Sequence, residues 1–144
     1  WLFGWPAALM FLVTVLSCVG LEALCLKLSG RPVADTLADG SAVLTGWLLA
    51  MSMPPWCPWW VCLIASVFAI CLAKHAFGGL GQNVFNPAMV GRIAVLVSFP
   101  LPMTSFIAPT HLGAAGTPSL ADAFAIIFGG SHAFDGHAGG ARLR

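Results

Sequence analysis

Long apolar runs alternate along the chain with short polar or glycine- and proline-rich breaks. The first run extends over residues 6–28, where only Glu22 and Lys27 carry charge. It supplies the ~20 apolar residues that a bilayer core requires, so it predicts a transmembrane helix. A second full span is expected over 58–74, ending at Lys74 and His75.

Two other apolar segments are shorter. They cover about residues 40–54, stopped by Pro54-Pro55, and 86–100, opened by Asn86-Pro87. At 1.5 Å per residue each reaches only about 20 Å, which is the length of a broken or half-spanning helix. Irregular backbone at membrane depth requires surrounding protein or a cavity. The helix starts therefore face either a cavity or cofactor, or neighbouring helices packed through small residues.

These segments predict an all-α membrane protein, a polytopic helical bundle with broken or half-spanning helices. Residues 1–100 form its membrane-embedded part, and 101–144 form an outer loop region. The polar stretch 29–39 is expected to be loop, and the glycine-rich stretch 77–87 cannot be continuous helix. Within the outer region a short helix is expected over 119–128, capped by its first serine and an aspartate in the first turn.

Composition supports the membrane assignment. Hydrophobic residues make up 59% of the 144 residues and charged residues 8%, against roughly a quarter in soluble domains. The net charge of +1 gives no basic cluster with which to bind nucleic acid. We expect no secretory signal before the first span. The chain starts without methionine, and we expect it to be a piece of a longer protein.

The basic residues predict the topology. Lys27, Arg31 and Lys74 flank the spans at one face, which the positive-inside rule assigns to the cytoplasm. The segment 101–144 then lies on the outer side of the membrane. The clustered Trp56, Trp59 and Trp60 are typical of anchors at the headgroup level.

A few polar residues inside the apolar segments are candidates for an ion path or a cavity: Asn83, Asn86, Arg92 and Glu22. Glu22 forms either an interfacial ion pair with nearby Lys27 or part of an ion pathway. Arg92 should face a partner helix, a water-filled cavity or an anionic ligand. The five cysteines lack metal-ligand spacing, so we expect packing roles and no metal site in this chain. The alternative is that one of them faces the metal centre of a partner subunit.

Two strings carry a resemblance to a known family. Residues 74–89, KHAFGGLGQNVFNPAM, resemble the signature shared by the D subunit of the Rnf electron-transport complex and the B subunit of the sodium-pumping NADH:quinone reductase. Residues 39–46, DGSAVLTG, and the Pro-Pro-Trp that follows also resemble this family, and the Rnf D subunit is the more similar of the two.

The resemblance implies a polytopic subunit with inverted repeats in a bacterial inner membrane. Together with other membrane subunits of the complex, it would couple electron transfer between NADH and ferredoxin to ion movement. Such a subunit is part of an enzyme complex and not an enzyme by itself. The rival interpretations are a solute or ion channel whose half-helices line a pore, and a purely structural assembly subunit.

The family also implies FMN, bound by phosphoester to a threonine in a Ser/Thr-Gly-Ala-Thr-Pro-Leu motif. The best counterpart here comprises Asp135, Gly139, Gly140 and Ala141. Ala141 has no hydroxyl to esterify, so covalent FMN is predicted to be lost, unless the native continuation differs. Thr117 is a weak substitute. Arg142 and Arg144 either hold a flavin phosphate non-covalently or are simply exposed.

Overall fold

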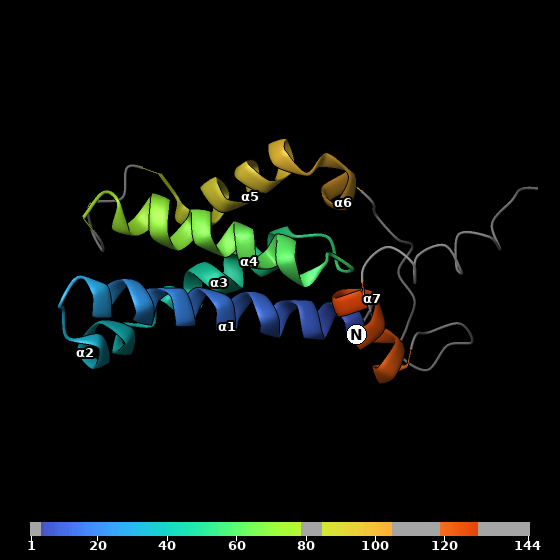
Figure 1. The fold of residues 1–144 in the computed structure, drawn as a ribbon, viewed down its shortest axis with the longest axis horizontal. Coiled ribbons are helices and arrows are strands. Elements are labelled where there is room, and N and C mark those ends of the chain that lie inside the picture. The colour runs from blue at the N-terminus through green and yellow to red at the C-terminus, as the bar shows by residue number, and fades with distance from the viewer. Residues whose placement is uncertain (1–3, 79–84, 105–118, 130–144) are drawn as a thin grey trace, which may run out of the picture.

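The computed structural model describes residues 4–78, 85–104 and 119–129 (Figure 1). Every regular element in these three ranges is a helix, as expected for an all-α fold. In chain order they are α1 (Gly4–Leu28), α2 (Val33–Ala38), α3 (Ser41–Ser52), α4 (Trp59–Val67), the π-helix η1 (Phe68–His75), α5 (Pro87–Ser98), α6 (Pro100–Thr104) and α7 (Leu120–Gly129).

The principal helices begin and end close to the expected segments. α1, α3 and α5 occupy the segments expected at 6–28, 40–54 and 86–100, while α4 and η1 together occupy 58–74. Among the described helices, only α1 is long and apolar enough to cross a membrane by length and composition; α3, α5 and α7 have 10–12 residues, and α4 with η1 has 17. Two full spans were expected, and only the first of them, α1, passes this test; the short α3 and α5 agree with the half-length segments.

Two short helices correct the sequence interpretation. α2 lies in a stretch expected to be loop, where Thr36 Oγ1 donates to the Pro32 carbonyl 3.1 Å away and Asp35 occupies the first turn. An acidic residue there interacts favourably with the helix dipole. α6 starts at Pro100, which was expected to end helical structure, because proline is tolerated in the first turn of a new helix.

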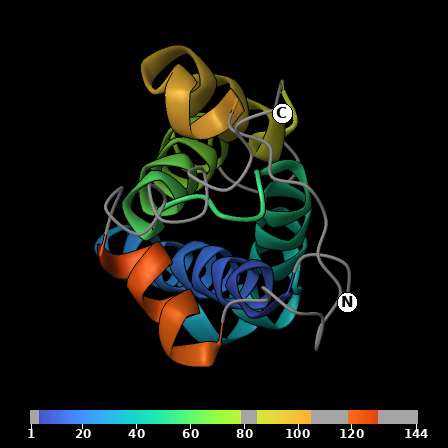
Figure 2. The same cartoon turned by 90° about the vertical axis from the view of Figure 1, so that its right-hand side faces the viewer.

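The helices alternate in direction along the long axis of the molecule. In Figure 1, α1 and the continuous α4–η1 helix run the same way, and α3 and α5 return. α1 packs against α3, α4 and α7, whereas α5 packs against η1, α4 and α3. Figure 2 shows this bundle from one end, with α7 crossing beside α1. One end of the bundle therefore collects the end of α1, the start of α3, the end of η1 and the start of α5.

Close packing at two glycines brings the helices together. A Cβ atom at Gly46 of α3 would lie 3.0 Å from Val15 Cα of α1. A Cβ atom at Gly91 of α5 would lie 2.5 Å from the Ala65 carbonyl oxygen of α4. Both helix pairs therefore approach through small residues.

The buried face of α1 follows a four-residue spacing, and most of its side chains are apolar. From Pro6 onward, its buried residues are Pro6, Met10, Thr14, Cys18, Glu22 and Leu26. Buried hydroxyls are satisfied within their own helices: Thr14 donates to the Met10 carbonyl, and Ser66 donates to the Cys62 carbonyl, each over 2.8 Å. Glu22 is therefore the charged exception in this stripe.

Candidate functional site

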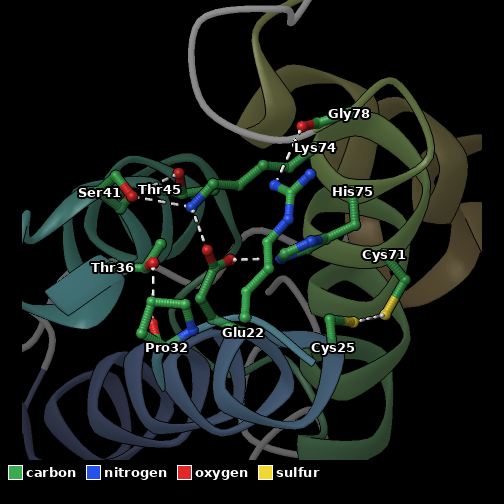
Figure 3. Close-up of polar contacts among 11 residues, drawn as sticks. Glu22, Cys25, Pro32, Thr36, Ser41, Thr45, Cys71, Lys74, His75 and Gly78 are labelled. Carbon is green, nitrogen blue, oxygen red and sulfur yellow. Dashed lines mark hydrogen bonds and ion pairs between the residues drawn. The ribbon is translucent and has the colours of Figure 1, made fainter. Parts of the chain in front are cut away.

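A buried polar cluster lies where α1, α3 and η1 meet (Figure 3). The Nζ atom of Lys74, near the end of η1, donates to Glu22 Oε1 of α1 over 2.7 Å. The same ammonium donates to Ser41 Oγ, at the start of α3, over 2.8 Å. The side chains of Lys74 and Glu22 are only 2% and 1% exposed. The cluster therefore ties three helices together through an ion pair shielded from solvent.

His75 is the fourth member of this cluster. Its Nε2 atom lies 3.1 Å from Glu22 Oε2, a distance at which a protonated imidazole forms an ion pair with the carboxylate. The two groups are not aligned for a hydrogen bond, and both atoms are buried without a hydrogen-bond partner among the described residues. We regard this as a close approach of two polar atoms that becomes an ion pair only when His75 carries a proton.

The π-helix explains how two consecutive residues both reach Glu22. In η1 the backbone pairs over five residues, as in the hydrogen bond from the Ala76 N–H to the Cys71 carbonyl, which is 3.0 Å long. A helix with i→i+5 bonds turns less per residue than an α-helix, where neighbouring side chains diverge by about 100°. The side chains of Lys74 and His75 therefore diverge less than they would in an α-helix, and both reach Glu22 of α1.

The local sequence also sets the start of α3. Gly40 has φ 66°, a left-handed conformation that favours glycine, and α3 begins at the next residue, Ser41. This turn places the Ser41 hydroxyl beside Lys74. Near the same end of the bundle, Arg31 Nη1 donates to the Gly78 carbonyl over 3.3 Å. Two cationic side chains therefore fix this end of the bundle. Lys74 joins the end of η1 to α1, and Arg31, just after α1, contacts the turn that follows η1.

The structure corrects the expected partner of Glu22. Lys27, five residues further along the chain, is exposed, and Lys74 takes its place. The short spacing in sequence suggested Lys27. Glu22 instead lies on the buried face of α1, which faces η1, whereas Lys27 does not. Sequence reasoning marked Lys74 and His75 only as residues ending a span, and it missed Ser41. The signal available in the sequence was Lys74 itself, an isolated lysine at the end of an apolar run, which could have been paired with the acid Glu22.

Two further predicted site residues that the structure describes, Asn86 and Arg92, do not join the cluster. Asn86 is exposed and caps α5, with its Oδ1 accepting from the Ala88 N–H over 3.1 Å, as the Asn-Pro pattern predicts. Arg92 lies in α5 and is half-buried. Outside the described residues lie Asn83, Thr117, Asp135, Gly139, Gly140 and Ala141.

Chemically, the cluster can hold and exchange a proton. It contains one carboxylate, one ammonium and one imidazole, and His75 is 13% exposed whereas Glu22 is 1% exposed. The imidazole therefore links the end of the bundle that solvent reaches with the buried acid. Within the described ranges, no three histidine, cysteine or acidic side chains converge in a way that could hold a metal ion.

Comparison with known proteins places the chain in a defined context. Residues 1–141 match the NQR2, RnfD, RnfE family. The chain is 50% identical over 143 residues to the D subunit of the ion-translocating oxidoreductase complex of Stutzerimonas stutzeri, covering 99% of this chain and 40% of that protein. It is 51% identical over 135 residues to the D subunit from Rhodobacter capsulatus, covering 94% and 37%. The chain thus spans about two-fifths of the length of these relatives.

Proposed function

The chain belongs to the NQR2, RnfD, RnfE family, and from this membership we propose that it forms part of the membrane-embedded D subunit of an ion-translocating oxidoreductase complex. The observation that carries the proposal is the match over residues 1–141, with 46–51% identity to three proteins bearing that name. The whole subunit would act with the other membrane subunits of the complex, in a bacterial inner membrane that it crosses several times.

The coupled process would be electron transfer between NADH and ferredoxin linked to ion movement. The described residues contribute the helical body and a buried set of ionisable side chains, with Glu22 between Lys74 and His75. Intramembrane ionisable residues that pair with one another commonly mark ion or proton paths. We assign Glu22 to the ion path, and Asn83, Asn86 and Arg92 to the segment that lines it.

A chimaeric subunit tests this proposal. Residues 1–141 would replace the corresponding segment of the Rhodobacter capsulatus D subunit, and NADH-driven ion uptake would be measured in inverted membrane vesicles. We expect the chimaera to support uptake and Glu22→Gln to reduce it, with Lys27→Gln as the control at an exposed site. An assembled chimaera that gives no uptake would contradict the proposal.

The channel alternative predicts a different result. Liposomes that contain the full-length subunit alone would then pass small solutes faster than empty liposomes do. Under our proposal the subunit alone is no more permeable than the control, because transport depends on electron transfer through the complex. Solute flux without any redox partner would favour the channel.

The residues available for flavin do not fit a covalent attachment in this segment. A phosphoester requires an oxygen nucleophile, and Ala141 offers only a methyl group. We propose that residues 105–144 carry no covalent FMN, and that any flavin held by Asp135, Gly139 and Gly140 is bound non-covalently. Ultraviolet fluorescence of the denatured full-length subunit, followed by mass spectrometry of its peptides, should find no flavin on this segment. A fluorescent peptide lost in Thr117→Ala would place the attachment at Thr117.

A further inference from the structure

A second contact joins α1 to η1 beside the buried ion pair. The Sγ atoms of Cys25 in α1 and Cys71 in η1 lie 3.3 Å apart, and no disulfide joins them. Figure 3 shows the two sulfur atoms pointing toward each other across the helix interface. Since the residues are 46 positions apart in sequence, only the folded arrangement of the helices brings them together.

The two thiols occupy the same helical turns as the charged cluster. Cys25 follows Glu22 by three residues, about one turn of α-helix, and Cys71 precedes Lys74 by three. The thiol pair and the ion pair therefore attach the same stretch of α1 to the same stretch of η1. Any covalent bond between the sulfurs would fix the helices next to the pair Glu22–Lys74.

The two sulfur atoms are close enough that a small movement would bring them to bonding distance. A disulfide requires the sulfurs to be 2.03–2.05 Å apart, so a 3.3 Å separation must close by about 1.3 Å. Both thiols are only partly buried, which leaves them open to a reagent. The other three cysteines, Cys18, Cys57 and Cys62, are all buried.

We propose that Cys25 and Cys71 form a reversible disulfide, with a lipid-soluble quinone as the oxidant. The two thiols lose two protons and two electrons as the S–S bond forms, and the quinone takes up both to become a quinol. A dithiol reverses the step by thiol–disulfide exchange, being itself oxidised to a cyclic disulfide. The inference rests on the thiol geometry alone and is independent of the proposed function.

The bond converts a polar contact between helices into a covalent one. In the reduced protein, the separation of α1 and η1 near Glu22 is held by the ion pair and by packing. In the oxidised protein the two helices cannot separate at that turn. The disulfide would therefore keep α1 and η1 at the separation at which Glu22 contacts Lys74.

Peptide mass spectrometry after quinone treatment tests the proposal. Membranes carrying the full-length subunit in its complex would be incubated with duroquinone, whose ring carbons are all substituted and so resist addition of thiols. Free thiols would then be alkylated and the protein digested. We expect a peptide pair joined through Cys25 and Cys71, and alkylation of both residues reduced by about tenfold or more. Dithiothreitol should restore alkylation.

Matched controls lie within the same chain. Cys57 and Cys62 are no more than 1% exposed, so they should stay reduced. Cys25→Ser and Cys71→Ser should each abolish the crosslinked peptide, and Cys18→Ala should leave it. If a serine variant fails to insert, the wild-type peptide masses still identify the bonded residues. Unchanged alkylation of Cys25 and Cys71, or a bond between Cys57 and Cys62 instead, would overturn the proposal.

Discussion

Lys74 lies at the end of an apolar helix, yet its ammonium group is almost fully shielded from solvent. Removing two charges from water costs several kcal/mol per ion, and their attraction offsets this only when the geometry is good. Here the ammonium has Glu22 at 2.7 Å and Ser41 at 2.8 Å. At the scale of single residues, the stability of this end of the bundle depends on both partners being present.

Substituting one partner of the pair should therefore be costly. We expect Lys74→Met to lower the free energy of unfolding by about 3–5 kcal/mol, because Glu22 would remain buried without its cation. Thermal unfolding in detergent would measure the loss, and Lys27→Met, at an exposed site, should have little effect. The double variant Glu22→Leu with Lys74→Met should regain much of the stability. Equal losses for the two lysine variants would contradict this account.

The sequence identified Glu22 as unusual but named the wrong partner. An acid within an apolar run is visible in the sequence, whereas its partner 52 residues away depends on how the helices pack. The buried stripe and the π-helical turn decide that Glu22 meets Lys74 and His75. The π-helical turn cannot be derived from the sequence, because an apolar run such as 68–73 has the same composition in an α-helix and a π-helix.

At the scale of the elements, the half-length helices depend on close backbone approach. A Cβ at Gly91 would collide with the Ala65 carbonyl, and the next atom that it would meet is Ala69 Cβ at 3.0 Å. Neither neighbour is a flexible side chain that can move aside. α5 can therefore lie this close to α4 and η1 only because residue 91 has no side chain.

Gly91→Ala should separate α5 from α4. We expect a loss of about 1–3 kcal/mol in unfolding free energy from overpacking. Gly20→Ala is a matched control in α1, because a Cβ there would meet nothing within 4 Å. This control should be neutral or slightly stabilising, since alanine favours helix over glycine. Thermal unfolding in detergent compares them, and equal stability of the two variants would argue against tight packing at Gly91.

The start of α5 depends on its cap. Asn86→Ala removes the acceptor for the Ala88 N–H and should cost about 1 kcal/mol. Asn86→Ser retains a capping oxygen and should lose much less. Hydrogen exchange of the first turn of α5 would detect the difference, with faster exchange expected in the alanine variant only. Equal exchange in both would show that Pro87 alone fixes this helix start.

The elements differed in how well the sequence predicted them. The start of α5 followed directly from Asn86-Pro87, and the capping serine of α7 pairs with Asp122 as expected, with Ser119 Oγ donating over 2.8 Å. The short helices α2 and α6 were missed. Both helices are too short to show the repeating pattern of apolar residues that identifies a helix in a sequence. In α6, moreover, Pro100 was interpreted as the end of a helix, although proline can also start one.

At the scale of the whole molecule, the described surface is rich in large apolar side chains. Along α1, Leu12, Leu16 and Leu24 are more than half exposed, on the side opposite the buried stripe. A soluble protein seldom leaves such a continuous apolar strip in water. Under the proposed function, this face would contact lipid or neighbouring membrane subunits.

Membrane extraction tests this view of the whole molecule. We expect the full-length subunit to remain in the membrane pellet after an alkaline carbonate wash and to enter solution only with detergent. A peripheral protein of the same complex is the control, and it should be released by carbonate. Recovery of the subunit as a stable, detergent-free monomer would contradict the membrane assignment.

The long sequence separation within the pair Glu22–Lys74 also has a consequence for biosynthesis. A ribosome that adds about 5–20 residues per second needs about 3–10 s to pass from one residue to the other. During that interval α1 has left the ribosome, but Lys74, the cationic partner of Glu22, has not yet been synthesised. Until then Glu22 lacks the cation that offsets the cost of burying its carboxylate, so we expect the contact between α1 and η1 to form only after Lys74 has been synthesised.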